Sequence, residues 1–537
     1  MQTEFDYIII GGGSAGCVLA GRLSEDPNIQ VCLIEAGGQG DSWTVNIPAA
    51  CVMSIPTKIN NWAFETVPQP GLNGRKGYQP RGKCLGGSSA INAMIYIRGH
   101  REDYDQWAQN GCSGWSYDEV LPYFIRSENN HRIQNEYHGN NGPLHVSDVQ
   151  TDSIFHERYI AAAQEQGYSI LDDFNGALQE GLGVYQVTHD NGERCSAARA
   201  YLFPHLKRPN LTILTQATTH KILIEHKTAV GVLVEHAGKT YPIKARKEVL
   251  LSAGAMQSPQ LLMLSGIGDS AELNEHGIET VHHLPGVGKN FHDHPDFIFG
   301  YTVKESTGTF GISLSGSIDM LKQIGRYRKE RRGMIASNFA ECGGFLKSRP
   351  DINIPNLQLH FVLALVDDHA RKFRASHGLS CHVCLLNPKS RGTVKISGPH
   401  IHDPLLIDPN FLGDERDLDD MVDGFKLTQK LMQSTSLVGL YKQDIFTAHV
   451  ETEEDIREVL RNRVDTVYHP VGSCKMGVDE LSVVDPELCV YGIQNLRVVD
   501  ASIIPAVVNG NTNAPTIMIA EKAVDMIRMR EQQAQVA

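Results

Sequence analysis

Three glycines near the N-terminus have the spacing of a phosphate-binding turn. Gly11, Gly13 and Gly16 follow the apolar run 5–10 and open the segment 14–23, whose small and apolar residues recur at helical spacing. The first glycine of such a turn permits a tight bend, the second lets the backbone approach a pyrophosphate, and the third lets the helix pack on the strand. The helix N-terminus adds free N–H groups and a positive dipole end. The predicted phosphate site comprises Gly11, Gly13, Ser14, Ala15 and Gly16.

An acidic residue follows the turn at the distance expected of a ribose-binding carboxylate. The apolar run 29–34 predicts a second strand, and Glu35 and Ala36 come directly after it. Glu35 lies 35 − 16 = 19 positions beyond Gly16, close to the roughly 20 of a dinucleotide fold. The N-terminal segment therefore predicts a strand–helix–strand unit that binds a dinucleotide.

A hydrolase motif overlaps the same turn. Gly12, Ser14 and Gly16 match a G-x-S-x-G nucleophile elbow, which needs its serine on a late strand with an acid and a histidine following. Ser14 instead follows the first strand, and Glu35 is better placed for a ribose. We therefore favour the dinucleotide interpretation.

Length and charge limit the classes of protein that need consideration. A chain of 537 residues exceeds one ordinary core and predicts two domains. The 49 basic and 62 acidic residues give a net charge of −13, which disfavours nucleic acid as a partner. The densest basic run, 326–332, contains a glutamate and is interpreted as a solvated helix face.

Cysteine usage and hydropathy suggest a reducing compartment. The eleven cysteines are scattered and mostly lie in apolar segments, which is typical of buried, reduced thiols. We see no signal peptide and no apolar stretch of the about 18 residues needed to span a bilayer. The expected location is the cytoplasm. Peripheral contact with the inner membrane is the closest membrane association that the sequence allows.

Further apolar runs predict the remaining main elements. Strands are expected at 211–214, 221–224, 230–235, 248–252 and 496–500, with more strands between 357 and 386 and a helix over 515–529. The runs 221–224 and 230–235 are close enough to form an antiparallel hairpin.

Four segments carry a resemblance to a known family. Residues 81–99 and 254–268 resemble the two signatures of the glucose–methanol–choline oxidoreductase family. Residues 468–477 resemble its catalytic-histidine segment, and residues 500–518 resemble its C-terminal flavin segment. The segments occur in the family's order and span most of the chain.

The resemblance implies a doubly wound α/β, Rossmann-like FAD-binding domain and an α+β substrate-binding domain built on an antiparallel sheet. Both domains are discontinuous in the sequence. The FAD-binding domain is predicted at 1–39, 74–106, 187–295 and 463–537, and the substrate-binding domain at 40–73, 107–186 and 296–462.

The cofactor implied by the resemblance is FAD, held without a covalent bond. Some family members attach the flavin through a histidine at the position of Ile91, which has no such nucleophile. Beyond the glycine turn and Glu35, the cofactor-binding residues are predicted to be Ala36, Arg81, Gly86, Gly87, Ser88, Asn92, Ala93, Met94, Ile95, Thr219, Ala253, Gly254, Asp500, Ala501, Asn511, Thr512 and Thr516.

The resemblance assigns the catalytic residues to the last part of the chain. His469 matches the family's base, and a histidine suits proton abstraction near neutral pH. Asn513 is assigned the family's second position, where it would hold the substrate oxygen. The predicted substrate pocket contains Tyr468, Met94 and Phe361.

The predicted activity is oxidation of a primary alcohol to an aldehyde, with a hydride passed to the flavin N5 and electrons passed on to a quinone-like or other acceptor. The motifs look most like those of bacterial choline and aliphatic-alcohol dehydrogenases. An alcohol oxidase that uses O₂ and makes H₂O₂ is one alternative, and a non-catalytic or photochemical flavoprotein is another. The sequence specifies neither the alcohol nor the oligomeric state.

Other polar clusters are interpreted as structural, and no metal site is predicted. Cys381 and Cys384 form a lone C-x-x-C pair in an apolar strand, where they are expected on opposite faces. The segment 292–294 resembles a structural stretch near the FAD. The histidines in 282–283 and 367–369 are interpreted as surface or loop residues.

Overall fold

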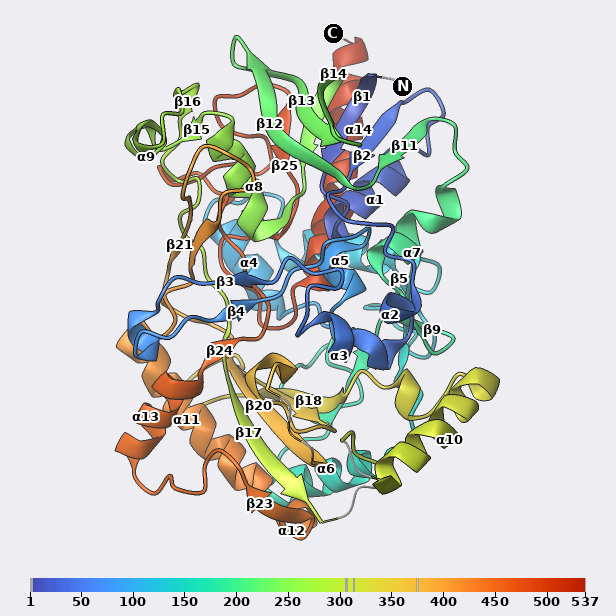
Figure 1. Ribbon diagram of the computed structural model, residues 1–537, viewed down its shortest axis with the longest axis vertical. Helices are drawn as coiled ribbons and strands as arrows, with labels where there is room; N and C mark the ends of the chain where they lie inside the picture. The colour runs from blue at the N-terminus through green and yellow to red at the C-terminus, as the bar shows by residue number, and fades with distance from the viewer. Residues whose placement is uncertain (1–2, 305–307, 312–313, 373, 375, 537) are drawn as a thin grey trace.

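The computed structural model describes residues 3–304, 308–311, 314–372, 374 and 376–536. Figure 1 shows one sheet in the upper half of the molecule and a second sheet in the lower half, with the connecting segments between them. The upper half contains both the N-terminal and the C-terminal segments of the chain.

The upper sheet combines a parallel layer with an antiparallel hairpin. Its strands follow the order β11-β2-β1-β14-β13-β12, and β25 pairs with β14. Pairing is parallel from β11 through β14 and at β25, and antiparallel among β12, β13 and β14. The strands are β1 (Glu4–Ile10), β2 (Val31–Ile34), β11 (Leu211–Leu214), β12 (Ala217–Glu225), β13 (Thr228–His236), β14 (Lys239–Leu251) and β25 (Leu496–Val498).

The parallel strands end level with one another. Ile10 pairs with Ile34 and with Leu251, and Leu251 pairs with Val498. The register therefore brings the glycine turn, Glu35 and the residues after Leu251 and Val498 to one edge of the sheet. In an open α/β sheet this carboxyl edge is where ligands bind.

Helices cover the parallel layer. Helix α1 packs on α14, which also packs on α5, and α1 contacts α7. In Figure 1, α14 is the long red helix that runs past the sheet to the C-terminus. The helices of this half are α1 (Ser14–Leu23), α4 (Arg101–Gln109), α5 (Tyr117–Ser127), α7 (Ala197–Tyr201), α8 (Gly254–Leu264), α9 (Ser270–Glu275) and α14 (Asn513–Val536).

The lower sheet is antiparallel. Its order is β18-β19-β20-β17-β23, with β24 on β17. The strands are β17 (Pro295–Val303), β18 (Ala340–Leu346), β19 (Leu357–Val362), β20 (Gly378–Leu385), β23 (Tyr441–Asp444) and β24 (Asp465–Thr466). Around it lie α6 (Ile154–Glu165), α10 (Leu314–Glu330), α11 (Glu415–Met432), α12 (Thr435–Val438) and α13 (Glu453–Arg463).

Short elements fill the connections. The strands are β3 (Phe64–Glu65), β4 (Tyr78–Gln79), β5 (Glu128–Asn130), β6 (Leu144–Asp148), β7 (Gly181–Val184), β8 (Gln186–Val187), β9 (His189–Asp190), β10 (Glu193–Arg194), β15 (Ile267–Gly268), β16 (His282–His283), β21 (Thr393–Ile396) and β22 (Leu405–Asp408). The helices are α2 (Trp43–Asn46) and α3 (Cys51–Ser54), and 3-10 turns include Gly87–Ala90 and Ala501–Ile503.

The predicted fold class is confirmed: an α/β half built on a parallel layer is joined to a half with an antiparallel sheet. The extents of several elements differ from the predicted ranges. The strand expected at 248–252 is the end of the long β14, and the region 357–386 contains two strands separated by a loop. The domain boundaries stay predictions.

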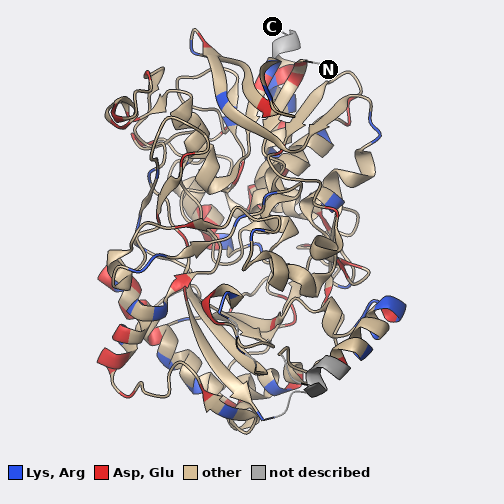
Figure 2. Ribbon diagram, in the orientation of Figure 1, with Lys and Arg blue, Asp and Glu red and all other residues tan. Residues whose placement is uncertain are grey.

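The cysteines and the basic run also have the expected character. The cysteines of the chain are free thiols, and all but Cys489 are buried. Arg326 pairs with Glu330 one helical turn away, and Arg331 pairs with Glu193. Figure 2 shows basic and acidic residues interspersed along the helices of the lower half.

Within the described ranges, no helix combines the length and the apolar character that crossing a membrane requires.

Adding one methyl group to the glycine turn tests how tightly helix α1 must pack on β1. A Cβ at Gly16 would lie 1.9 Å from the Gly11 carbonyl oxygen, whereas a Cβ at Gly325 in α10 would contact nothing. We expect Gly16→Ala to lower stability by about 1–3 kcal/mol and to reduce flavin content. Gly325→Ala is the matched control and should change stability by less than about 1 kcal/mol. Thermal unfolding and the flavin-to-protein absorbance ratio measure both effects, and equal values for the two variants would contradict the prediction.

Candidate active site

A cavity of about 400 Å³ begins at the carboxyl edge of the parallel layer and reaches the antiparallel sheet. Its volume falls in the range of roughly 300–1,000 Å³ typical of cofactor and ligand sites. It brings together residues that the sequence predicted separately. They are Gly11, Gly13, Ser14, Ala15, Glu35, Ala36, Arg81, Gly87, Ser88, Asn92, Ala93, Met94, Ile95, Thr219, Ala253, Gly254, Tyr468, His469, Asp500, Ala501, Asn511, Thr512, Asn513 and Thr516.

The glycine turn has the geometry that a phosphate cradle requires. Gly11 has φ +99°, and a Cβ there would lie 2.5 Å from the Ser252 carbonyl oxygen. A Cβ at Gly13 would meet its nearest atom only at 4.0 Å, and a Cβ at Gly254 would meet none within 4 Å. Since Gly13 and Gly254 both line the cavity, their bare backbones leave room for a ligand to approach closely.

A second glycine loop packs against this turn. Gly86 donates its N–H to the Gly12 carbonyl at 2.7 Å, and a Cβ at Gly87 would lie 2.6 Å from the Gly13 Cα. Gly16 and Gly86 do not line the cavity themselves. They hold the two loops together, and the loops line it through Gly13 and Gly87.

Glu35 lies buried at the end of β2 and lines the cavity. Its two carboxylate oxygens accept N–H bonds from Gly12 at 2.8 Å and Gly37 at 2.7 Å. Burial raises the pKa of this carboxyl to about 7, against the lowering effect of the two backbone N–H groups. Each oxygen keeps a lone pair that can accept a ribose hydroxyl.

Asp500 has a structural task at the same edge. It accepts bonds from the Gly254 N–H at 2.8 Å and the Ser258 hydroxyl at 2.6 Å, and from the Ser502 N–H at 2.7 Å. Its carboxylate thereby fixes the start of α8. Burial raises the pKa of Asp500, and these three neighbouring donors oppose the rise.

Unpaired buried polar atoms in the cavity wall support a fit for a polar cofactor. Thr219 Oγ1, Ser252 Oγ, Asn338 Oδ1 and His360 Nδ1 are buried without a hydrogen-bond partner, and all four residues line the cavity. Leaving such groups unpaired is costly, and a bound ligand is one way to satisfy them. With the two glycine loops and the N-termini of α1 and α14, these residues fit a dinucleotide such as FAD.

The imidazole of His469 contacts a carboxamide, as the predicted catalytic pair requires, but the carboxamide is that of Asn511. Asn511 Nδ2 lies 3.0 Å from His469 Nε2, and Gln358 Nε2 donates to Asn511 Oδ1 at 3.1 Å. Because Asn511 Oδ1 accepts from Gln358, its NH₂ group faces the imidazole. On the other side of the ring, His469 Nδ1 lies 3.1 Å from His294 Nδ1.

This network assigns the tautomers of both histidines. With the amide orientations that the structure gives, Asn511 donates and His469 Nε2 is the unprotonated, accepting nitrogen. The proton of His469 then sits on Nδ1 and is donated to His294 Nδ1. The lone pair of His469 Nε2 lies beside the Asn511 NH₂ group, at residues that line the cavity.

The prediction that Asn513 partners His469 is wrong. Asn513 begins α14 and accepts a hydrogen bond from the Ser14 hydroxyl at 2.8 Å, which links the first residues of α14 and α1. Asn511 precedes the helix, beside Gly510 at φ +152°. The two asparagines are two positions apart, and where the helix starts determines which one reaches the imidazole.

The backbone around His469 is held from both sides. Arg81 donates to the Tyr468 carbonyl at 2.8 Å, and the His469 N–H donates to Asp293 Oδ1 at 2.8 Å. The segment 292–294 therefore supports the site: Asp293 holds the backbone and His294 holds the ring. Burial raises the pKa of Asp293 to about 6.

The antiparallel sheet supplies the wall opposite the glycine loops. Alternation along β19 places His360 and Val362 at the cavity, and His382 on β20 joins them, with its Nδ1 2.6 Å from Asp296 Oδ2. The prediction for Phe361 is wrong for the same reason. Its side chain points to the opposite face, where it is fully buried and packs on Tyr159 at 5.0 Å between ring centroids.

His369 is a cavity residue that the sequence interpretation missed. The segment 367–369 was assigned to a surface or loop, yet His369 is only 6% exposed and lines the cavity. Its Nδ1 lies 2.6 Å from the Tyr468 hydroxyl, and its Nε2 lies 3.2 Å from Asp465 Oδ2. No periodic pattern marked it, because Asp368, His369 and Ala370 all have left-handed φ angles of 49°, 56° and 62°.

Met94 is fixed in an unusual conformation beside the cavity. It has φ +62° and donates its N–H to Asn92 Oδ1 at 3.0 Å. Arg194, which is fully buried, donates to both the carbonyl and the side chain of Asn92 at 2.7 Å. The predicted contacts of Met94 and Tyr468 with the cavity are thus present, although their roles toward a substrate stay predictions.

Several histidines near the cavity are held neutral by burial. Burial lowers the pKa of His294 and His360 to about 3, and lowers that of His469 well below its ordinary value, with further lowering from the neighbouring histidines. His469 is therefore unprotonated at neutral pH, as a general base must be.

Comparison with known proteins shows the family. Family models described as GMC oxidoreductase match residues 5–296 and 388–520. The chain belongs to the GMC oxidoreductase family, which confirms the resemblance noted in the sequence.

Similar proteins cover nearly the whole chain. "Alcohol dehydrogenase [acceptor]" of Pseudomonas putida is 46% identical over 97% of this chain and 95% of its own. "Oxygen-dependent choline dehydrogenase" of Escherichia coli K12 is 43% identical over 98% and 96%. Among solved structures, pyridoxine 4-oxidase from "Mesorbium loti" has a TM-score of 0.88 at 29% identity over 98% and 99% of the two chains. An Aspergillus oryzae formate oxidase variant has a TM-score of 0.91 at 27% identity over 99% of each.

These matches, together with the site, define the protein as an FAD-dependent oxidoreductase that acts on CH–OH donors. That FAD is bound without a covalent link stays a prediction, which the aliphatic side chain of Ile91 in the cavity wall supports.

The depressed histidine pKa values predict a pH dependence of stability. A histidine whose folded pKa lies below its unfolded value of about 6.5 stabilises the fold above that pH, and this contribution is lost as the pH falls further. For His360, with a pKa of about 3, the loss by pH 5 is about 2 kcal/mol.

We expect the stability of wild type relative to His360→Gln to decline by this amount between pH 7.5 and 5. Buried carboxyls with raised pKa values, such as Glu35, respond with the opposite sign but are common to both proteins and cancel. Chemical denaturation of the two holoproteins at each pH measures the difference. A pH-independent difference would contradict the neutral, buried state of His360.

Proposed function

We propose that the protein oxidises uncharged, apolar primary alcohols to aldehydes and passes the electrons to an acceptor other than O₂. The observation that carries the proposal is the hydrogen-bonded chain Asn511–His469–His294 in the wall of a dinucleotide-sized cavity. FAD, when bound, supplies the acceptor for the hydride that leaves the carbinol carbon.

His469 acts as the base. Its Nε2 is the nitrogen without a proton, and its depressed pKa keeps it so at neutral pH. The alcohol hydroxyl takes a position beside Nε2 and the Asn511 NH₂ group, replaces the hydrogen bond between them, and donates its proton to Nε2. His294 Nδ1 accepts the Nδ1 proton of His469 throughout, so that the ring cannot turn or change tautomer.

Asn511 orients the substrate oxygen. Its NH₂ group is aimed by the Gln358 bond to its Oδ1, so it needs no reorganisation to donate to the oxygen as negative charge develops there. A carboxamide cannot accept the proton in place of His469, because its nitrogen has no basic lone pair.

The composition of the cavity wall supports an uncharged substrate. Near the antiparallel sheet the wall is largely aliphatic and aromatic; these residues are Cys51, Val52, Ile55, Phe339, Ala340, Val362, Ala364, Leu365, Val366 and Val467. Among the described lining residues the carboxylates are Glu35 and Asp500, both at the parallel-sheet edge.

A quaternary ammonium group would meet no carboxylate among the described residues of this part of the wall, and the lining ring of Phe339 already contacts Phe310 at 4.1 Å between centroids. It binds best to a carboxylate or to the open face of an aromatic ring. Trp62 lines the cavity, but the Lys83 ammonium lies 4.1 Å from its ring centroid, and Phe64 stacks on it at 5.7 Å. A second cation on Trp62 would be repelled.

The identity of the electron acceptor is the more specific part of the proposal. The name of the 46% identical relative, "Alcohol dehydrogenase [acceptor]", supports an acceptor other than O₂. An oxidase is the second candidate, favoured by the names of two similar solved structures, pyridoxine 4-oxidase and formate oxidase.

Three variants separate the roles of the two asparagines and the histidine. His469→Ala should lower the rate of anaerobic flavin reduction by alcohol by at least about 1,000-fold, since it removes the base. Asn511→Ala should lower it by about 100- to 1,000-fold, the usual effect of losing an oxyanion donor. Asn513→Ala should change it by less than about 10-fold, because its bond goes to Ser14. Stopped-flow absorbance measures all three, with flavin content as the control for folding.

A larger effect for Asn513→Ala than for Asn511→Ala would restore the assignment made from the sequence. Full-speed reduction in the His469 variant would exclude it as the base.

An alcohol panel tests the substrate class and the acceptor. We expect kcat/KM for aliphatic primary alcohols to exceed that for choline by about 100-fold or more, because an unpaired buried cation costs several kcal/mol. Each alcohol is assayed with a quinone analogue under argon and with O₂ alone. A preference for choline would contradict the apolar pocket, and equal rates with O₂ alone would favour the oxidase.

A further inference from the structure

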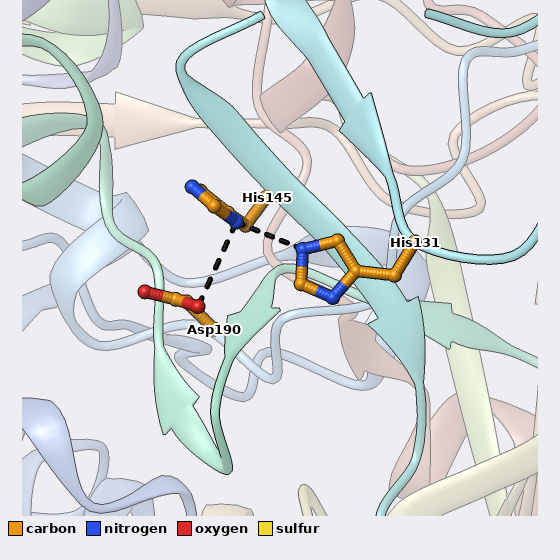
Figure 3. Close-up of side chains that lie close together, drawn as sticks. All are labelled: His131, His145 and Asp190. Atoms are coloured by element: carbon orange, nitrogen blue, oxygen red, sulfur yellow. Dashed lines mark hydrogen bonds and ion pairs between the residues drawn. The ribbon is translucent and has the colours of Figure 1, made fainter. Parts of the chain in front are cut away.

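Two histidines and an aspartate meet on the surface, outside the catalytic cavity. His131 follows β5, His145 lies in β6, and Asp190 ends β9, and Figure 3 shows their three side chains converging. His131 Nε2 lies 2.8 Å from His145 Nδ1, and His145 Nδ1 lies 3.6 Å from Asp190 Oδ1. One ligand atom from each residue falls within 4.8 Å of the other two.

Paired backbone segments hold these side chains in place. β5 and β6 pair in parallel, with Asn129 opposite His145, and the His131 N–H donates to the Val146 carbonyl at 2.9 Å. Asp190 belongs to the β9–β10 hairpin, where it pairs with Glu193. The hairpin is anchored by Arg194, a fully buried residue that donates to the Val45 carbonyl at 2.8 Å.

The spacing of the ligand atoms is close to that of a tetrahedral metal site. Zinc binds imidazole nitrogen and carboxylate oxygen at about 2.0–2.2 Å, so tetrahedral ligands lie about 3.3 Å apart. The observed separations of 2.8 and 3.6 Å lie on either side of this value.

The charges around the cluster leave one carboxylate oxygen of Asp190 available to a metal. Arg199 lies 3.7 Å from the other oxygen of Asp190, Oδ2, so that Oδ1 remains for the metal, and Glu193 Oε2 at 2.6 Å offsets the charge of Arg199.

We propose that His131, His145 and Asp190 bind a divalent d-block cation, represented by Zn²⁺, with water in the fourth position. Two imidazoles and one carboxylate form a donor set that such cations favour over Mg²⁺ or Ca²⁺. The cation would tie the segment after β5, strand β6 and the β9–β10 hairpin to one another. This site is independent of the proposed alcohol chemistry.

A second cluster of similar composition offers an internal control. His220, Glu235 and His402 also gather three possible ligands. There both imidazoles approach the same carboxylate oxygen, at 2.9 and 3.6 Å, which is the arrangement of two hydrogen-bond donors sharing one acceptor. The His402 side chain is 68% exposed and would lose more conformational freedom on binding.

Calorimetric titration with ZnCl₂ tests the proposal on the tag-free holoprotein at pH 7.5 after treatment with a chelator. We expect one equivalent of Zn²⁺ to bind to wild type and to raise its melting temperature. His131→Ala and Asp190→Asn should weaken this binding by on the order of 100-fold, since even outer-shell changes cost 10- to 100-fold. His220→Ala should bind as wild type does.

His131 is exposed, so its replacement leaves the core intact, and an unchanged circular dichroism spectrum and flavin content confirm the fold. Wild-type affinity in both His131→Ala and Asp190→Asn would overturn the proposal. Loss of binding in His220→Ala alone would overturn it as well and assign the cation to the second cluster.

Discussion

The catalytic arrangement depends on the orientation of one carboxamide. Asn511 has its oxygen bound by Gln358, a residue of the antiparallel sheet, and its nitrogen against His469. His469 is in turn held by His294, which precedes the first strand of that same sheet. The proton-accepting nitrogen is thus set by contacts between the two halves of the molecule, and neither half contains the site by itself. This explains why the chain passes repeatedly between the two sheets before the last helix begins.

The sequence predicted well the features that rest on short-range rules. The glycine turn, Glu35 and the parallel strands follow from spacing and periodicity, and the parallel register then brings their ends together without further information. Residues whose place depends on where an element begins were predicted less well. The place beside His469 was predicted for Asn513 but is held by Asn511, because α14 begins at Asn513 rather than near Pro515. Phe361 was assigned to the pocket because the sequence identified its strand. The sequence did not show which face of that strand meets the cavity.

The backbone conformations of a third group could not be predicted, because no local pattern specifies them. Met94, Phe339, His369, Ala370 and Tyr468 all have positive φ angles although none is glycine, and all line the cavity. Such conformations cost of order 1–3 kcal/mol each and persist only where the surroundings enforce them. Here the enforcing contacts include Asn92 at Met94 and Arg81 at Tyr468. The proposed metal cluster could not be predicted for another reason, since its ligands lie 14 and 45 positions apart with no recognisable ligand spacing.

The environment of His469 constrains how the proposed reaction proceeds. A base whose pKa is held well below its ordinary value is always ready to accept a proton, but it holds that proton weakly. His469 Nδ1 faces neutral His294, whereas many catalytic histidines face a carboxylate, and the nearby Asp293 bonds to the backbone N–H rather than to the ring. The protein itself therefore stabilises an imidazolium only slightly. Under the proposed mechanism, stabilisation of the substrate oxygen during proton abstraction rests on Asn511, whose NH₂ group faces His469 Nε2.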